Sequence, residues 1–448
     1  MLAGVHMNTK EKLSIFFKEP YLNKYDELEI LIEGTNNILA RFADNDIIQS
    51  ISQEKTSVRF RVLKDKKTGI ASTNDLTELG LLESFNKALS VLEFMPKNEG
   101  LLPLFDDSIK FIKDNNYKMR SHEEKAKSIK EALKLVEEKN MKAAGIDSEV
   151  VESMTLLNSN GIEKKSFVTE SNFSISITEP TKGWAGQIVK NSDDLNHLEI
   201  TKRAIEIALI NKDAVGIEAK EYDVVLSPDA ATDLFSFLGI YALNAKGFYE
   251  KTGAFTELDK KVIGDNITLT DDPFNKLKSG FSFDYEGVNR KELELIKDGV
   301  LVNIPLDREY AEKLNKKTTG HGLTQPNNWG AIPINLVVKS GESSKEEMIK
   351  STKYGLYINR FHYTNIINPK DMTFTGMTRD GLFLIEDGKI TKAVKNLRFT
   401  DSILRLLNNV ESLSKERVVT ALFMSPSSSA IIPFVKIKGF KFSSTTEF

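Results

Sequence analysis

Few residues of this chain could hold a metal ion or serve as a nucleophile. The 448-residue sequence has no cysteine, which excludes thiolate catalysis, disulfides and cysteine-ligated zinc. Its histidines are His6, His122, His197, His321 and His362. The one His-Glu pair, His122-Glu123, lacks a second histidine one helical turn later, which a zinc-binding helix needs on the same face. We therefore interpret this pair as the start of a helix.

Two of the histidines lie in polar sequence beside turn-forming residues. His321 is part of TTGHGL, and His362 is part of RFHYTN. If the two met in a cleft, they could hold a metal ion or move a proton. The alternative is one hydrogen-bonded histidine in a loop and another in a strand, and we favour this alternative. No phosphate-binding loop or nucleophile elbow accompanies them, because the sequence contains neither motif.

The composition is typical of an ordinary globular protein. The net charge is −3, and lysine and glutamate are interleaved without a basic stripe, which argues against direct binding of nucleic acid. The longest apolar run, Leu234 to Leu243, includes a serine and a glycine and is too short to cross a bilayer. We find no targeting segment and expect a cytoplasmic protein that begins at Met1 or Met7.

The first half of the chain contains two segments with similar apolar patterns. The matching apolar residues are Ile47, Val58, Phe60 and Val62 in the first copy and Ile162, Phe173, Ile175 and Ile177 in the second. Alternation of apolar and polar residues predicts half-buried strands, and each copy continues into a helical pattern. This similarity indicates a duplicated unit of a strand meander followed by a helix. The alternative is that the two meanders are unrelated and similar by chance.

These units define the predicted organisation. An N-terminal region at 8–213 would hold two similar meander-helix units, at about 20–95 and 140–213, joined by a helix at 121–139. Residues 220–448 would form a strand-rich, mixed C-terminal domain. The predicted fold class is therefore α+β.

The C-terminal domain should open with a strand and a helix. Tyr222 to Leu226 is apolar, and Ser227-Pro228 combines a helix N-cap with proline at the first helical position. The helix would run towards Gly247, and one later helix would span residues 402–413. The rest of the domain is rich in strand patterns and turn signals.

One run of this domain resembles the TldD/PmbA family. Residues 271–301, DDPFNKLKSGFSFDYEGVNRKELELIKDGVL, contain the core Phe283-Asp284-x-Glu286-Gly287. Further similar pieces are Thr319-Gly320, Gly341-Glu342, Gly355-Leu356-Tyr357, Phe374-Thr375-Gly376 and Gly388-Lys389-Ile390. Their order and spacing make the chain similar to members of this family over roughly residues 20–448.

The resemblance implies a function for the family and a departure in this chain. TldD-type members resemble zinc peptidases that use a helical H-E-x-x-x-H motif and a later cysteine, whereas PmbA/TldE-type members lack these residues and pair with a TldD-type subunit. Aligned on the strand VVLSP, this chain has Ser236 and Tyr241 at the histidine positions and Phe237 at the glutamate position. No histidine lies between His197 and His321, so no shift of the alignment restores the motif.

Three functions are compatible with these residues. We favour a non-catalytic PmbA/TldE-like subunit, inactive alone and without metal or cofactor, that pairs with a TldD-like zinc peptidase subunit to process unfolded peptides. The second is an enzyme with a different site, for which the candidate residues are Asp284, Glu286, His321 and His362. The third is a self-associating peptide-binding protein, with a homodimer as one possible form. For Asp284 and Glu286, the alternative to catalysis is a turn in which the carboxylates accept backbone hydrogen bonds.

Overall fold

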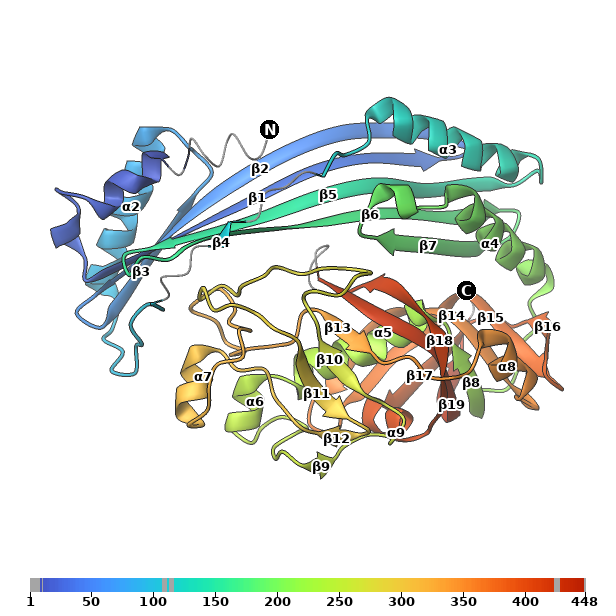
Figure 1. Ribbon diagram of the computed structural model, residues 1–448. Helices are drawn as coiled ribbons and strands as arrows, with labels where there is room; N and C mark the ends of the chain where they lie inside the picture. Colours follow the sequence, from blue (N-terminus) through green and yellow to red (C-terminus); the bar gives the residue numbers. More distant parts are fainter. Residues whose placement is uncertain (1–8, 10, 107–110, 113–116, 423–427, 447–448) are drawn as a thin grey trace.

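Two β-sheets form the framework of the protein. The computed structural model describes residues 9, 11–106, 111–112, 117–422 and 428–446. Within that part, a seven-stranded N-terminal sheet with long strands arches over a C-terminal layer built on a twelve-stranded sheet (Figure 1). Helices and mostly antiparallel strands thus occur together, which confirms the predicted α+β fold class.

The N-terminal sheet contains two antiparallel meanders. The elements of this half are β1 (Glu27–Ala43), β2 (Asp46–Lys64), β3 (Lys67–Thr73), α2 (Glu78–Phe94), β4 (Phe111–Ile112), α3 (His122–Glu137), β5 (Lys142–Asn158), β6 (Glu163–Glu179), β7 (Gly183–Val189) and α4 (His197–Ile210). Two long strands, a short strand and a helix follow one another twice, and β1 pairs with β5 to join the copies. This correspondence supports the proposal that the unit was duplicated.

The two faces of the N-terminal sheet have different neighbours because successive side chains of a strand point to opposite sides. Ile30 and Phe60 pack with Phe85 of α2 on one face. Leu31, the next residue along β1, faces the other way and packs with Phe283 of the C-terminal layer. The sheet is therefore covered by its own helices on one side and by the C-terminal half on the other.

The C-terminal layer surrounds its first strand. Its elements are β8 (Glu221–Leu226), α5 (Pro228–Phe237), a π-helix (Leu238–Ala242), α6 (Ala245–Tyr249), β9 (Lys260–Lys261), β10 (Leu269–Asp271), β11 (Leu293–Lys297), β12 (Val300–Leu301), α7 (Arg308–Lys313), β13 (Leu336–Val338), α8 (Lys345–Lys350), β14 (Tyr354–Asn368), β15 (Thr373–Glu386), β16 (Lys389–Ala393), β17 (Leu397–Ser402), α9 (Ile403–Asn408), β18 (Val410–Ala421) and β19 (Ser429–Thr445). β8 lies between β14 and β19, and β17 pairs with both β15 and β19, so these strands close into a ring. Phe361, Phe399 and Phe440 pack together in the large core of this layer.

The late helix predicted at 402–413 is too long. α9 ends at Asn408, and β18 begins two residues later at Val410, which pairs with Ile437 of β19. Strand pairing with β19 thus overrides the local helical pattern of the last residues, a tertiary effect that the sequence periodicity does not reveal.

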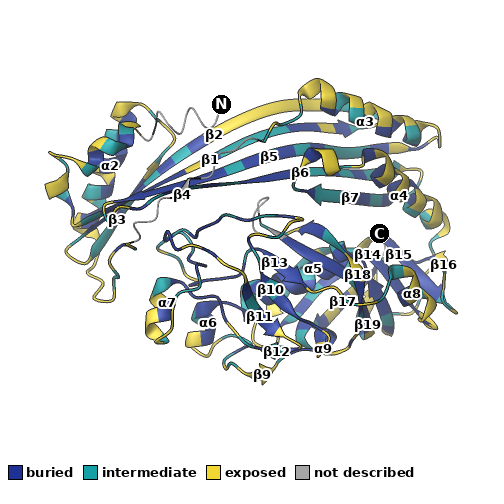
Figure 2. Cartoon of the chain, viewed as in Figure 1, coloured by how far each residue is buried: buried dark blue, intermediate teal, exposed yellow. Residues whose placement is uncertain are grey.

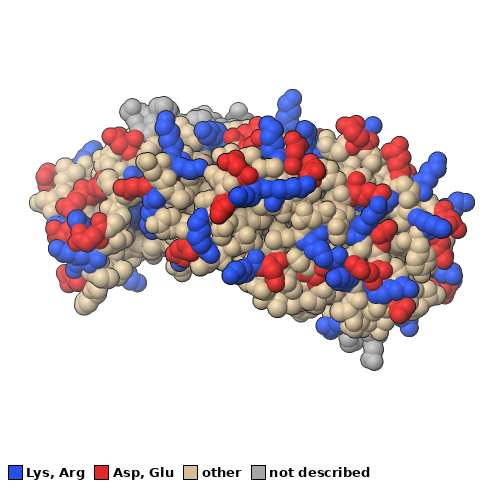
Figure 3. All heavy atoms as spheres, turned by 90° about the horizontal axis from the view of Figure 1, so that it is seen from below, with Lys and Arg blue, Asp and Glu red and all other residues tan. Residues whose placement is uncertain are grey.

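The surface is mixed in charge. Lysine and arginine are interspersed with aspartate and glutamate on the face seen in Figure 3, and Figure 2 shows the exposed residues on the outer sides of the helices and along β2. In the described ranges, we find no helix with the length and apolarity needed to span a membrane.

Buried hydrogen bonds and a cation–π contact join the two layers. Lys164 of β6 is fully buried, and its Nζ donates to the Gly287 carbonyl and to Asn289 Oδ1, both at 2.8 Å. Lys278 of the C-terminal layer places its Nζ 2.9 Å from Oε2 of Glu170, which also belongs to β6. Between β7 and β14, the Arg360 guanidinium lies 4.5 Å from the centre of the Trp184 ring.

A buried charge cluster lies between α3 and β5. Lys125 is fully buried, and its Nζ lies 3.0 Å from Asp147 Oδ1 and 2.8 Å from Glu149 Oε1. Arg120 contacts the same two carboxylates, and His197 Nε2 lies 2.8 Å from Asp147 Oδ2. Two buried carboxylates therefore depend on neighbouring cations for compensation.

The cluster makes Lys125 far more important for stability than an exposed lysine of the same helix. We expect Lys125→Ala to lower the free energy of unfolding by about 3–5 kcal/mol, because it leaves buried carboxylates with one cation fewer. Lys127→Ala, on the exposed side of α3, should change it by less than about 0.5 kcal/mol. Chemical denaturation of both variants measures the difference, and equal stabilities would contradict it.

Candidate functional site

The helix aligned with the metal motif starts directly after β8. Ser227 caps α5 by accepting a hydrogen bond from the Ala230 amide, and Pro228 occupies the first turn. α5 continues into the π-helix, where the Leu243 amide donates to the Leu238 carbonyl at 3.1 Å. Residues five apart point about 140° apart around a regular α-helix. The wider π turn brings such residues closer to one face.

The aligned side chains are packed. Ser236 is buried, and its Oγ has no hydrogen-bond partner among the described residues. Phe237 is buried as well, with its ring centre 6.1 Å from that of Tyr241. The Tyr241 ring in turn packs edge-on against Trp329 at 5.8 Å. Ser236 and Phe237 therefore belong to the interior, and the half-buried Tyr241 packs at its edge.

These side chains do not fit a zinc ion. Structural and catalytic zinc sites use imidazole, thiolate and carboxylate ligands, and the positions here hold a hydroxyl and two aromatic rings. In the part of the chain that the structure describes, no three histidine, aspartate or glutamate side chains are grouped as a metal ion would require.

Asp284 shapes a tight turn against the N-terminal sheet. Its Oδ1 accepts from the amides of Glu286 and Val288 at 3.0 and 2.9 Å, and its Oδ2 accepts from the Gly322 amide at 2.7 Å. Gly287 in the same turn has a φ of +85°, and a Cβ there would come within 2.7 Å of the Ile162 side chain. The carboxylate thus acts as an acceptor of backbone hydrogen bonds.

Glu286 is a buried acid beside this turn. Its Oε2 accepts from the Arg308 amide at 2.9 Å. Burial, followed by the neighbouring Asp284 carboxylate, raises the pKa of Glu286 to about 8. Burial also raises the pKa of Asp284, although its three amide donors oppose that rise. At neutral pH we therefore assign the negative charge to Asp284 and a proton to Glu286.

His321 belongs to a second buried network. Its Nδ1 lies 2.9 Å from Thr319 Oγ1, and its Nε2 lies 3.2 Å from Asp271 Oδ1 without hydrogen-bond geometry. Asp271 also accepts from Arg290 Nη2 at 2.5 Å and from the Asn335 amide at 2.9 Å. Burial opposes ionisation of Asp271, but Arg290 and His321 outweigh it and hold its pKa below the ordinary value.

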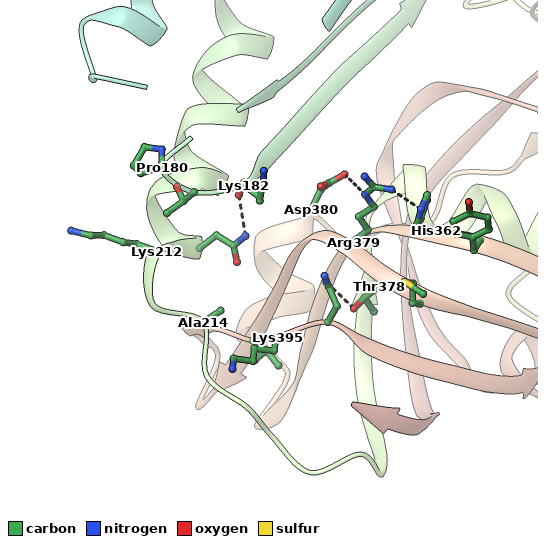
Figure 4. Close-up of a pocket in the computed structure, with 15 residues that line it drawn as sticks. Pro180, Lys182, Lys212, Ala214, His362, Thr378, Arg379, Asp380 and Lys395 are labelled. Atoms are coloured by element: carbon green, nitrogen blue, oxygen red, sulfur yellow. Dashed lines mark hydrogen bonds and ion pairs between the residues drawn. The ribbon is translucent and has the colours of Figure 1, made fainter. Parts of the chain in front are cut away.

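His362 lies in a different environment, on a cavity of about 660 Å³ (Figure 4). Arg379 Nη1 is 2.6 Å from His362 Nε2 and donates to it. Burial, with the charges of Arg379 and Arg360, lowers the pKa of His362. His321 does not line this cavity, so the structure does not bring the two histidines together as an acid–base pair.

Sequence reasoning missed two acids on α5. Asp229 and Asp233 are four residues apart and therefore share a face of the helix. Burial raises the pKa of each to about 6, and the charge of Arg360 partly opposes the rise. The spacing within PDAATD was the available signal, but only the packing of α5 shows that the two side chains are half-buried.

Comparisons with known proteins agree with the fold. Residues 219–444 match the family model described as the PmbA/TldA metallopeptidase C-terminal domain. Residues 28–92 match the model described as PmbA/TldA metallopeptidase domain 1. The first range includes β8, α5 and the turn at Asp284.

Individual relatives are similar over most or about half of their length. A metalloprotease of Methanocaldococcus jannaschii is 23% identical over 416 residues, which are 88% of this chain and 90% of the relative. A zinc metalloprotease TldD homologue of Saccharolobus solfataricus is 25% identical over 50% of this chain and 52% of its own length. The crystal structure of TldE from Thermococcus kodakarensis superposes with a TM-score of 0.85 at 22% identity, covering 97% of this chain and 100% of that one.

The packing around α5 predicts opposite outcomes for two adjacent substitutions. Phe237→Ala should lower the free energy of unfolding by about 3–5 kcal/mol, because it removes a buried aromatic ring. Ser236→Ala should change it by less than about 0.5 kcal/mol, because it removes a buried hydroxyl that lacks a described partner. Thermal and chemical unfolding of both variants measure the two effects, and a large loss for Ser236→Ala would contradict this description.

The buried Glu286 predicts a pH dependence of stability. Its folded-state pKa of about 8 lies above the ordinary value of about 4.3, so the folded state holds the proton more tightly. Stability should therefore fall as the pH rises between these two values. Glu286→Gln should flatten the melting temperature between pH 5 and 9, whereas Glu309→Gln, on the exposed side of α7, should follow the unaltered chain. Parallel curves for all three proteins would contradict the assignment.

Proposed function

The chain belongs to the TldD/PmbA family and has a TldE-like fold, and from this premise we propose that it is a non-catalytic subunit of a heteromeric metallopeptidase that acts on unfolded peptides. Several relatives are named metalloproteases, among them proteins named TldD homologues. In the proposed complex, a TldD-like subunit supplies the zinc ion and its ligands. This chain would contribute a subunit of the same fold that pairs with the TldD-like subunit.

The replacement of the motif side chains carries the proposal. Ser236, Phe237 and Tyr241 occupy the positions that the family resemblance assigns to two imidazoles and a carboxylate, and the sequence has no cysteine. A hydrolytic zinc centre needs ligands for the metal and an open position for water. The buried Phe237 ring instead fills space where an activating carboxylate would be needed.

The backbone at this place supports descent from a metal-binding helix. The π turn at Leu238–Ala242 begins two residues after Ser236 and includes Tyr241, and it widens the helix for a pair spaced by five residues. We infer that this turn is retained from a metal-binding ancestor.

An open strand edge supports the handling of extended chains. β3 pairs with β2 only from Val58 onwards, so residues 46–57 pair on one side alone within the described structure. Ile48 on this stretch is 65% exposed, and Figure 2 shows the exposed part of β2. Such an edge can accept an extended peptide or the edge of another sheet by strand addition.

The alternative enzyme has less support. Asp284 is occupied by three amide donors, and His321 and His362 lie in separate environments. No pair of these residues forms a nucleophile and base in hydrogen-bond contact. They fit structural roles in a turn, a buried network and a cavity wall.

The proposal predicts activity that depends on a partner. The isolated chain should not cleave an unfolded peptide, and addition of a TldD-like subunit should produce cleavage that a zinc chelator abolishes. Ser236→Ala should leave this activity unchanged, and a histidine-to-alanine change in the partner's motif should abolish it. The measurement is cleavage of a fluorogenic unfolded peptide. Chelator-sensitive cleavage by the purified chain alone, retained after removal of contaminating peptidases, would refute the non-catalytic role.

A further inference from the structure

A small cavity lies where the N-terminal sheet meets α7 and the turn of Glu286. Its volume is about 240 Å³, smaller than the pockets that hold drug-sized ligands. Its charged lining residues are Arg61 of β2, Glu286, Arg308 and Glu309. Its apolar wall consists of Ile70, Met95, Pro96, Leu101, Leu102 and Pro326. The cavity is thus large enough for one or two small residues of a chain.

The Arg61 guanidinium in this cavity is incompletely bonded. Arg61 is 9% exposed, and its Nη1 lies 3.5 Å from Glu29 Oε1. Its Nε is buried and has no hydrogen-bond partner among the described residues. A buried donor of this kind costs free energy unless a ligand or water accepts from it. Arginine presents its N–H groups in a planar fork that fits a carboxylate.

The surrounding charges favour an anion. Arg308 lines the cavity, and Arg59 is near enough to Glu29 to favour that carboxylate's charged form. Arg59 and Arg308 use one Nη each on the carbonyls of Gln325 and Pro103. Burial keeps a proton on Glu286 at neutral pH and raises the pKa of Glu29. The cavity wall thus carries the guanidinium groups of Arg61 and Arg308 against the Glu309 carboxylate, which is paired with Lys313.

We propose that this cavity binds a carboxylate that carries a short apolar group, with the guanidinium groups of Arg61 and Arg308 as the principal donors. The free carboxyl end of a peptide with an apolar last residue has this chemistry, and so does a free short-chain carboxylic acid. The cavity lies between the two layers and beside the loop that leads from Gln325 to Trp329, the residue that packs on Tyr241. The choice of a peptide end as ligand rests on the proposed function, whereas the carboxylate site does not.

Calorimetric titration of the isolated full chain tests the site. The probes are Ala-Ala-Leu with a free carboxyl end, the same tripeptide as its C-terminal amide, and 4-methylpentanoate. The free acid should bind at least about 10-fold more tightly than the amide, because the amide loses the charge-assisted hydrogen bonds. Tighter binding of the tripeptide than of 4-methylpentanoate identifies a peptide end, and the reverse order identifies a free acid. Equal binding of acid and amide, or no heat with either acid at millimolar concentration, would overturn the proposal.

A variant locates the binding in this cavity. Arg61→Lys keeps the charge beside Glu29 but lacks Nε–H and the fork, so it should weaken binding of the free acid at least about 10-fold. Arg398→Lys, at an exposed position of β17, should leave binding unchanged. Unchanged binding by a folded Arg61→Lys variant would contradict the site. If the variant does not fold, the comparison of acid and amide on the unaltered chain still tests whether a carboxylate is bound. The titration uses no partner subunit, so its failure would count against the carboxylate site alone. Failure of the cleavage assay would count against the proposed function.

Discussion

The contact between Lys164 and the turn at Gly287 joins the two halves of the protein. A fully buried lysine loses its hydration, and two acceptors on the opposite layer compensate it at 2.8 Å. The Asp284 side chain helps to hold these acceptors in place by accepting hydrogen bonds from three backbone amides, and backbone hydrogen bonds also close the turn. The turn also buries Phe283 against Leu31. The run that most resembles the family is therefore a structural joint, and its acids have a physical role without catalysis.

The helix after β8 likewise contains residues whose packing explains them without catalysis. α5 crosses the C-terminal layer and is covered on most sides, so its packing residues are constrained whether or not a metal is bound. Phe237 and Tyr241 extend an aromatic contact to Trp329, and the π turn sets the direction of the last residues. The packing of this helix therefore does not depend on a bound metal ion. This gives the proposed non-catalytic subunit a stable surface to present to a partner.

The sequence predicted the strand-rich α+β fold because the alternation at Val58, Phe60 and Phe173 reflects strands whose side chains point by turns to the two faces of a sheet. It also predicted the start of α5, where Ser227-Pro228 acts as cap and first turn. It did not predict the end of α9, because pairing of Val410 with β19 is not local. Buried lysines such as Lys125 and Lys164 were also missed, since lysine is usually exposed and only distant chain segments supply their partners. The cavity at Arg61 likewise combines segments that are far apart in sequence.

We propose that the chain keeps the family fold while a partner subunit supplies the metal chemistry. Native mass spectrometry of the chain isolated from its own cells under gentle conditions, combined with metal analysis of each species, distinguishes the two subunits. We expect a complex with a TldD-like chain whose zinc remains with that chain after dissociation, leaving this chain with far less than one zinc. A stoichiometric, tightly held zinc ion on this chain alone would refute the non-catalytic role.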